Sequence, residues 1–188
     1  MQPAVFLDRD GVINRDKGYV WRIEDFEFLP GVFDACRHLN QLGYALVIVT
    51  NQSGIGRGYF SFDDFAVLNN WMLQQFVANG VHISDVKNCP YHPTEGVGEF
   101  RIESVYRKPG PQMLLDAAVD HQLDLSASFI VGDKASDIQA GKNAGVQKCF
   151  LIHPQGTQAV LQAYGADAVY ASLYDMVQTE FKVEGKAS

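Results

Sequence analysis

Ala4-Val5-Phe6-Leu7-Asp8-Arg9-Asp10-Gly11 is the stretch of this 188-residue sequence that decides its fold. Four apolar residues are followed directly by two carboxylates that stand one residue apart. This order predicts a buried first strand with Asp8 and Asp10 at its carboxyl end. Open α/β sheets carry their functional groups at that end of the strands. Because acidic pairs also arise by chance among 22 acidic residues, further motifs are needed to support a functional site.

Three further motifs accompany this stretch. Thr50-Asn51-Gln52-Ser53 closes the apolar run at 44–49, and Gly132-Asp133-Lys134, with Asp137, closes the run at 128–131. Arg107-Lys108-Pro109 lies between them. Short apolar, β-branched runs alternate with helix-like segments, a pattern typical of βαβ units. The sequence therefore predicts an α/β fold with a mostly parallel sheet.

The expected elements follow from these patterns. Strands are expected near 4–8, 44–50, 83–88, 128–132, 147–152 and 167–170. Helices are expected within 31–43, 62–79, 111–121 and 135–145, and from Leu173 to Phe181. Residues 184–188 are expected to fray.

Composition narrows the class of protein. A chain of 188 residues with 47% hydrophobic content suits one domain, residues 1–188. The net charge of −7 disfavours a nucleic-acid-binding surface, which needs clustered Lys and Arg. No apolar stretch approaches the ~20 residues that span a bilayer, and residues at the start of the sequence lack the basic-then-apolar pattern expected of a signal peptide. Three cysteines without framework spacing fit a reducing compartment. We expect a cytoplasmic monomer that has a metabolite as its partner.

Taken in order, the four motifs resemble those of the haloacid dehalogenase superfamily of phosphohydrolases. The resemblance covers about residues 4–153 and is closest to the branch that contains histidinol-phosphate and heptose-bisphosphate phosphatases. It implies a Rossmann-like three-layer sandwich. The segments between the motifs are too short for a cap domain, so the site is expected to be capless. Its roof would consist of loops near 15–25, 54–60 and 89–107.

The resemblance also implies roles for the motif residues. Asp8 would be the nucleophile that forms an aspartyl-phosphate, which splits phosphate-ester hydrolysis into two steps. Asp10 would protonate the leaving alkoxide and then deprotonate the attacking water. Thr50 and Lys108 would hold the oxygens of the transferred phosphoryl group.

A metal is needed because the substrate and Asp8 are both anionic, and Mg²⁺ is the expected cofactor. The resemblance places it on the Asp8 carboxylate, the Asp10 main-chain carbonyl and Asp133. Asp137 either reaches the metal through water, orients Lys134, or is an ordinary carboxylate in the first turn of a helix.

The segments 13–20, 25–32 and 50–58 resemble the heptose-bisphosphate phosphatases, which implies removal of the C7 phosphate of a heptose 1,7-bisphosphate. The expected substrate contacts are Asp16, Tyr19, Asn51, Gln52, Ser53, Arg57 and Arg107. A second phosphate needs a cation of its own; Arg107 is the best candidate, with Arg57 and Lys17 as alternatives.

Other functions stay open. Histidinol phosphate carries an amine, which the carboxylates Glu95, Glu99 and Glu103 in the roof could meet. A non-catalytic binding protein on the same fold is a second alternative. A polynucleotide 3′-phosphatase shares the motifs but conflicts with the acidic net charge.

One loop departs from the family pattern. Many relatives bind a structural zinc there through Cys-x-His and Cys-x-Cys, whereas this chain has Cys89-Pro90-Tyr91 and Ser104-Val105-Tyr106. Cys89 and His92 alone cannot complete a four-coordinate zinc shell, so no structural zinc is predicted. The apolar side chains expected to anchor this loop are Tyr91, Val97, Phe100, Val105 and Tyr106. Gly54, Gly56 and Gly58 predict a second, mobile loop.

Overall fold

The protein is built on a six-stranded sheet in which every strand pair is parallel. The structure is a computed structural model and describes residues 1–181, so the fraying expected at 184–188 lies outside it. The strands are β1 (Ala4–Leu7), β2 (Ala45–Asn51), β3 (Asp85–Cys89), β4 (Phe129–Gly132), β5 (Lys148–Ile152) and β6 (Ala168–Tyr170). All six lie where the sequence predicts strands, which confirms an α/β fold.

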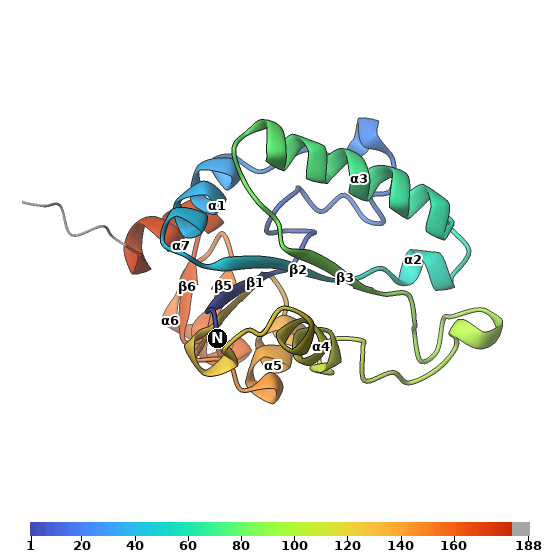
Figure 1. Cartoon of the computed structure of the whole chain (residues 1–188). Coiled ribbons are helices and arrows are strands. Elements are labelled where there is room, and N and C mark those ends of the chain that lie inside the picture. The colour runs from blue at the N-terminus through green and yellow to red at the C-terminus, as the bar shows by residue number, and fades with distance from the viewer. Residues whose placement is uncertain (182–188) are drawn as a thin grey trace, which may run out of the picture.

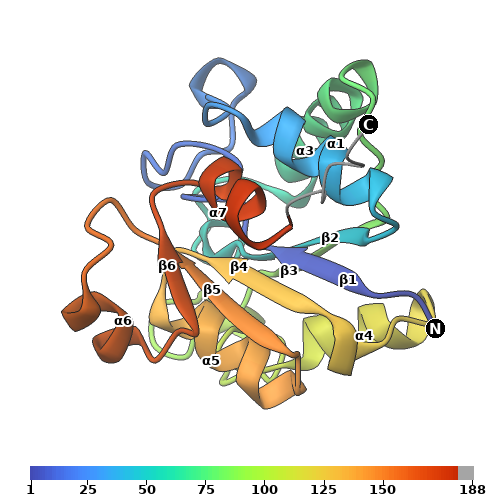
Figure 2. The ribbon, with the colours of Figure 1, turned by 90° about the vertical axis from the view of Figure 1, so that its left-hand side faces the viewer.

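Helices cover both faces of the sheet, as Figures 1 and 2 show. The upper layer in Figure 1 holds α1 (Val32–Gln41), α3 (Phe62–Ala78) and α7 (Leu173–Glu180), and the lower layer holds α4 (Gln112–Asp120) and α5 (Ala135–Ala144). Two shorter helices are α2 (Ser53–Gly56) and α6 (Gln158–Tyr164), and the 3-10 turns are η1 (Ile23–Asp25), η2 (Gly98–Phe100) and η3 (Leu125–Ala127). None of the helices in residues 1–181 has the length and apolar character needed to cross a membrane.

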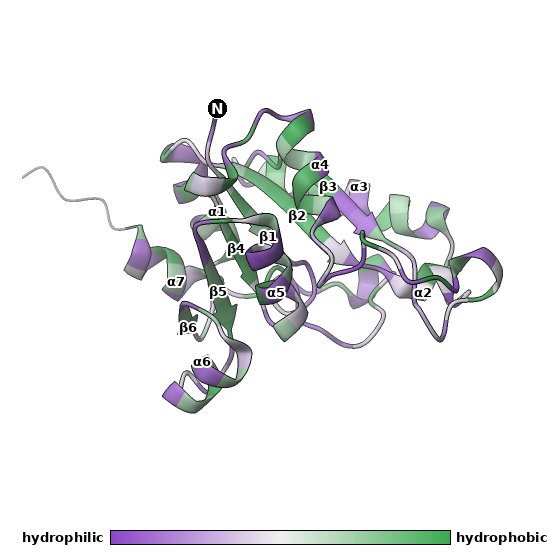
Figure 3. Ribbon diagram, turned by 90° about the horizontal axis from the view of Figure 1, so that it is seen from below, coloured by the Kyte–Doolittle hydropathy of each residue, from purple (hydrophilic) through white to green (hydrophobic). Residues whose placement is uncertain are grey.

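The apolar runs are continuous because the sheet is buried on both faces. In β1, Val5 and Leu7 join the core under α1, α3 and α7, whereas Ala4 and Phe6 join the core under α4 and α5. The central strands are accordingly coloured as hydrophobic in Figure 3. The edge strand β3 differs from the central strands, because most of its residues are polar and only half-buried.

The strand order β3-β2-β1-β4-β5-β6 determines where in the sheet a binding site can form. The chain runs from β1 outward to β3 and then returns to β4 on the other side of β1. Such a reversal opens a crevice at the carboxyl ends of the strands. The end of β1 is held there, since the main-chain N–H of Asp8 donates to the Val131 carbonyl at 2.9 Å.

Two helices were not predicted. The Gly54 to Gly58 segment begins as the buried helix α2 and is not the mobile loop that the glycines suggest. A Cβ atom on Gly54 would collide with the Phe60 ring, and one on Gly56 would collide with the Pro90 carbonyl. These two glycines therefore permit close packing. The other helix, α6, is capped by the Thr157 side chain and ends at Gly165.

Candidate active site

Lys108 forms ion pairs with a carboxylate of the first motif and with a carboxylate of the last motif. Its ammonium group lies 2.8 Å from Oδ1 of Asp8 and 2.7 Å from Oδ1 of Asp137, and it donates to the Val49 carbonyl at 2.7 Å. All three charged side chains are buried. Burial would lower the pKa of Lys108, but Asp137 and Asp8 hold that pKa above its ordinary value. Lys108 therefore stays cationic beside the predicted nucleophile.

Asp137 lies in the first turn of α5, as one of the predicted alternatives had it, but its ion pair with Lys108 was not predicted. One carboxylate oxygen pairs with Lys108, and the other accepts from the main-chain N–H of Lys134 at 2.9 Å, which caps α5. The side chain thus combines a helix cap with an ion pair. It orients the Lys134 backbone, but its main charged partner is Lys108.

Asp8, Asp133 and Asp137 form an acidic cluster whose candidate ligand atoms all lie within 4.8 Å of one another. Oδ1 of Asp133 is buried and has no hydrogen-bond partner in the described residues. Burial, with the charge of Asp8 beside it, raises the pKa of Asp133 to about 7. Burial likewise raises the pKa of Asp8, against the effect of Lys108. Buried carboxylates with an unsatisfied oxygen fit a hard divalent cation.

Gly11 allows this cluster to form. Its backbone has φ +90°, and a Cβ at this position would collide with the Asp133 carboxylate. The glycine that follows the two motif carboxylates therefore lets the β1 turn approach Asp133 closely.

Asp10 is held by three donors. Arg9 donates from Nη2 to Oδ1 at 3.2 Å and to Oδ2 at 3.0 Å. Asn14 donates to Oδ1 at 2.9 Å, and Gln52 donates to Oδ2 at 3.1 Å. Gln52 also donates to the Thr50 hydroxyl at 2.8 Å, which joins the second motif to the first. Sequence analysis missed Arg9 and Asn14, although Arg9 stands between the two motif carboxylates.

The crevice holds a cavity of about 540 Å³ that collects the predicted residues. All seven expected substrate contacts line it, together with Asp10 and Lys108: Asp16, Tyr19, Asn51, Gln52, Ser53, Arg57 and Arg107. Asp8 and Thr50 are not lining residues but hydrogen-bond to the lining residues Lys108 and Gln52. The further lining residues are Gly18, Gly54, Pro109, Lys134 and Ser136. Lys134 could have been expected because it directly follows Asp133.

Two of the three expected cations for a second phosphate lie in this cavity. Arg57 pairs with Glu95 and lies 5.5 Å from the centre of the Tyr19 ring. Arg107 donates to the Tyr91 carbonyl at 3.2 Å and keeps further donors. Lys17 is not a lining residue and pairs with Glu27, so the geometry favours the two arginines.

The loop at 89–107 is held by main-chain contacts. His92 and Phe100 are joined by a main-chain hydrogen bond of 3.0 Å, and the Val97 N–H donates to the Gly56 carbonyl at 2.8 Å. Tyr91 and Phe100 pack as the predicted apolar anchors. The other three predicted anchors are wrong because their side chains are exposed: Val97, Val105 and Tyr106. Close packing against α2 takes their place.

The two remaining zinc-type residues of this loop do not form a metal cluster with other described residues. Cys89 is buried, and Nδ1 of His92 accepts from the Glu95 N–H at 3.0 Å. The absence of structural zinc stays a prediction.

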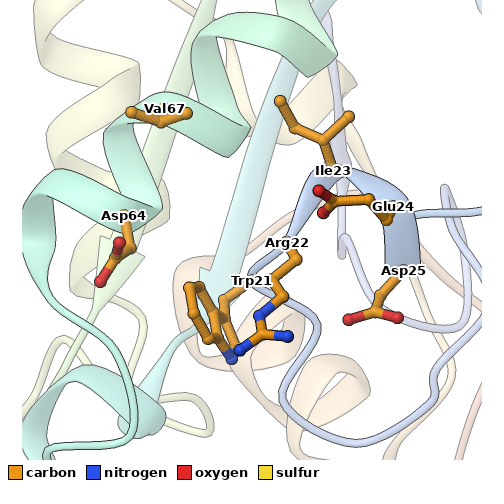
Figure 4. Close-up of a pocket in the computed structure, with 7 residues that line it drawn as sticks. All are labelled: Trp21, Arg22, Ile23, Glu24, Asp25, Asp64 and Val67. Atoms are coloured by element: carbon orange, nitrogen blue, oxygen red, sulfur yellow. The ribbon is translucent and has the colours of Figure 1, made fainter.

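A second cavity, of about 570 Å³, lies between η1 and the start of α3 (Figure 4). Its cation, Arg22, stacks over Trp21 at 4.5 Å. The other charged lining residues are Glu24, Asp25 and Asp64. Because these carboxylates repel a phosphate, and no predicted site residue lines this cavity, the first cavity is the candidate active site.

Comparison with known proteins agrees with this geometry. The family model described as "HAD-hyrolase-like" matches residues 105–176. The chain is 51% identical to D-glycero-alpha-D-manno-heptose-1,7-bisphosphate 7-phosphatase of Burkholderia mallei, over 93% of this chain and 91% of that protein. It is 44% identical to D-glycero-beta-D-manno-heptose-1,7-bisphosphate 7-phosphatase of Yersinia pestis, over 93% of each.

A solved structure is also similar, that of D,D-heptose 1,7-bisphosphate phosphatase from B. bronchiseptica complexed with magnesium and phosphate. The TM-score is 0.79 at 29% identity, and the match covers 94% of this chain and 96% of that one. The identities over nearly the full length of these relatives show the family. The chain therefore belongs to the haloacid dehalogenase-like hydrolases, in the family of the D-glycero-D-manno-heptose 1,7-bisphosphate 7-phosphatases.

Proposed function

We propose that this protein removes the C7 phosphate of D-glycero-D-manno-heptose 1,7-bisphosphate, as a step toward nucleotide-activated heptose, with Mg²⁺ as cofactor. The observation that carries the proposal is the layout of the cavity. Lys108 lines the cavity and is ion-paired with the buried carboxylate of Asp8, and two arginines, Arg57 and Arg107, line the same cavity. A bisphosphate needs two cationic binding sites, one for each of its phosphate groups.

Asp8 acts as the nucleophile. Its carboxylate oxygen attacks phosphorus and forms an aspartyl-phosphate, which water then hydrolyses. Asp10, fixed by its three donors, gives a proton to the leaving alkoxide and takes one from the attacking water. The Lys108 ammonium and the Thr50 hydroxyl hold the oxygens of the transferred phosphoryl group.

Asp8 and Asp133 would hold Mg²⁺ through their carboxylates, and Asp10 would hold it through its main-chain carbonyl. Oδ1 of Asp133 supports this assignment, because it accepts no hydrogen bond from the described residues and its charged neighbour, Nζ of Lys134, is 3.9 Å away. When bound, the cation neutralises charge between Asp8 and the substrate phosphate. The magnesium in the B. bronchiseptica relative supports the choice of metal.

Arg107 takes the C1 phosphate, because its planar guanidinium suits bidentate contact with phosphate oxygens. Arg57 lies in the same wall, already paired with Glu95. Of the three roof carboxylates that could receive the amine of histidinol phosphate, Glu95 is thus already paired with a cation.

Further expectations complete the proposal. We expect a cytoplasmic monomer that binds neither nucleic acid nor membranes and holds no structural zinc. The acidic net charge of −7 supports the first exclusion, and the incomplete set of zinc ligands supports the last.

The test compares phosphate release, with Mg²⁺ present, from the heptose bisphosphate and from histidinol phosphate. We expect kcat/KM to favour the heptose by about 100-fold or more, which is about 2.7 kcal/mol. Asp8→Asn should abolish turnover of both esters. The reverse preference would assign the protein to histidinol phosphate, and turnover of neither by the wild type would support a non-catalytic binding protein.

A further inference from the structure

Arg9 is a buried cation for which the proposed chemistry gives no role. Its side chain is only 2% exposed and is the largest among the fully buried side chains of the described residues. Burying a guanidinium is costly unless it is paired and hydrogen-bonded. The groups that it contacts therefore indicate why it is there.

Those contacts connect Asp10, which lines the cavity, to the roof loop at 15–25. Nη2 of Arg9 donates to both carboxylate oxygens of Asp10, and also to the Val20 carbonyl at 2.7 Å. Val20 follows Tyr19, which lines the cavity wall. The guanidinium carbon also lies 5.9 Å from the centre of the Phe26 ring. One side chain thus fixes the carboxyl group of Asp10 relative to the roof segment at 15–25.

The neighbouring donors show that Arg9 has a distinct place. Asn14 reaches only Oδ1 of Asp10, and Gln52 reaches only Oδ2. Arg9 contacts both oxygens, so rotation of the carboxyl group would break its contacts. We propose that Arg9 is a positioning residue, which holds Asp10 where it protonates the leaving group. The inference rests on the proposed function, and it adds a residue to that function.

The two chemical steps show what Arg9 would affect. In the first, the bond from the Asp8 oxygen to phosphorus forms, the bond to the leaving oxygen breaks, and a proton moves from the Asp10 carboxyl to that oxygen. In the second, the water oxygen bonds to phosphorus, the bond to the Asp8 oxygen breaks, and a water proton moves to Asp10. Arg9 neither gains nor loses a proton, so its effect passes through Asp10.

Esters with different leaving groups provide the test. A sugar alkoxide needs the proton from Asp10, whereas p-nitrophenolate leaves without one, and kcat/KM covers this first step. We expect Arg9→Met to lower kcat/KM for the heptose bisphosphate by about 100-fold. For p-nitrophenyl phosphate we expect a loss of less than about 5-fold, because a loss of acid catalysis does not slow this ester. Equal losses for both esters would overturn the inference.

A double-mutant cycle gives the same answer with one substrate. If Arg9 acts through Asp10, adding Arg9→Met to Asp10→Asn should change heptose turnover by less than about 3-fold. A loss as large as in the wild-type background would contradict the inference. Arg9→Lys keeps a buried cation in case Arg9→Met fails to fold. The lysine side chain is one bond shorter than the path to Nη2, the atom that makes all three contacts, so its ammonium falls short of them and the same difference between esters is expected.

Two controls separate the possible failures. Arg37→Met removes an arginine whose pairing with Asp34 is exposed, and it should leave both kcat/KM values unchanged. If the wild-type protein hydrolyses neither ester, the proposed function fails, and the role of Arg9 fails with it. If the wild type hydrolyses the heptose and both Arg9 tests show no dependence on Asp10, only the role of Arg9 fails.

Discussion

The Nζ atom of Lys108 lies 2.7 Å from Oδ1 of Asp137, in an ion pair whose two side chains are both buried. Lys108 pairs with Asp8 as well, so it is shared between two carboxylates. Asp137 therefore draws the ammonium partly away from the nucleophile. Without that second carboxylate, Asp8 would be the one charged partner of Lys108 among the described residues, beside the neutral Val49 carbonyl.

Asp137→Asn tests this balance. The amide oxygen can still cap α5, but the negative charge is lost. We expect a loss of about 1–3 kcal/mol in the free energy of unfolding, because a charged hydrogen bond is removed. We expect kcat/KM to fall by about 10-fold or more, because Lys108 then binds Asp8 in place of the phosphoryl oxygens. Urea unfolding and steady-state kinetics measure the two effects.

Asp34→Asn is the matched control, since Asp34 pairs with Arg37 on the surface. Exposed pairs contribute little, so this variant should resemble the wild type in both measurements. An Asp137→Asn protein that is as stable and as active as Asp34→Asn would show that the buried pair has no such role.

The raised pKa of Asp133, about 7 in the metal-free protein, predicts how Mg²⁺ binding depends on pH. Below this pKa the metal must displace a proton, so apparent affinity should fall by up to about 10-fold per pH unit on the acid side. Titrations by calorimetry at about pH 8 and about pH 6 measure this difference. An affinity that does not change over this range would contradict the assignment of Asp133 as a ligand.

The same shift affects stability without metal. The folded pKa lies above the unfolded value of about 3.9, so between these values the folded state binds a proton that the unfolded state lacks. As the pH falls through about 7, this group therefore stabilises the metal-free protein. The stabilisation by Mg²⁺ should shrink over the same interval.

Arg107→Ala should reduce the preference for bisphosphate over monophosphate. Loss of a charged contact to the C1 phosphate is expected to raise KM for the bisphosphate by about 10-fold to 100-fold. The kinetics of the heptose 7-phosphate should change little, because that ester lacks the C1 phosphate. Arg101→Ala, an exposed arginine in the same loop, is the control. If the preference survives in Arg107→Ala, another group binds the C1 phosphate.

Gly56→Ala should loosen the loop at 89–107. Its new Cβ would collide with the Pro90 carbonyl, so we expect a destabilisation of about 1–3 kcal/mol. Limited proteolysis should then cut within this loop faster than in the wild type. Gly156→Ala is the control, because a Cβ there meets nothing closer than 3.9 Å. Equal protection in the two variants would mean that contact with α2 does not order the loop.

The fold and the position of the site could be predicted because the signals are local. The apolar run before Asp8 is continuous, since β1 is buried on both faces. Motifs that end parallel strands must meet at one edge of the sheet, and for that reason the residues around Asp8, Thr50 and Asp133 were placed together in advance.

The pairings inside the site could not be predicted. Lys108 and Asp8 are 100 residues apart, and the sequence does not determine which atoms meet at such a separation. Arg9 would usually be expected at the surface, because arginines are rarely fully buried unless they are paired. Val97 and Val105 were wrongly assigned as anchors because the loop is held by main-chain groups, which every sequence contains.

The most direct test of the central claim is phosphorus NMR of the heptose 1,7-bisphosphate during turnover with Mg²⁺. We predict that the C7 monoester signal is replaced by inorganic phosphate while the C1 signal persists. Loss of the C1 phosphate, or two unchanged ester signals in the presence of folded, Mg²⁺-bound protein, would contradict the proposed function.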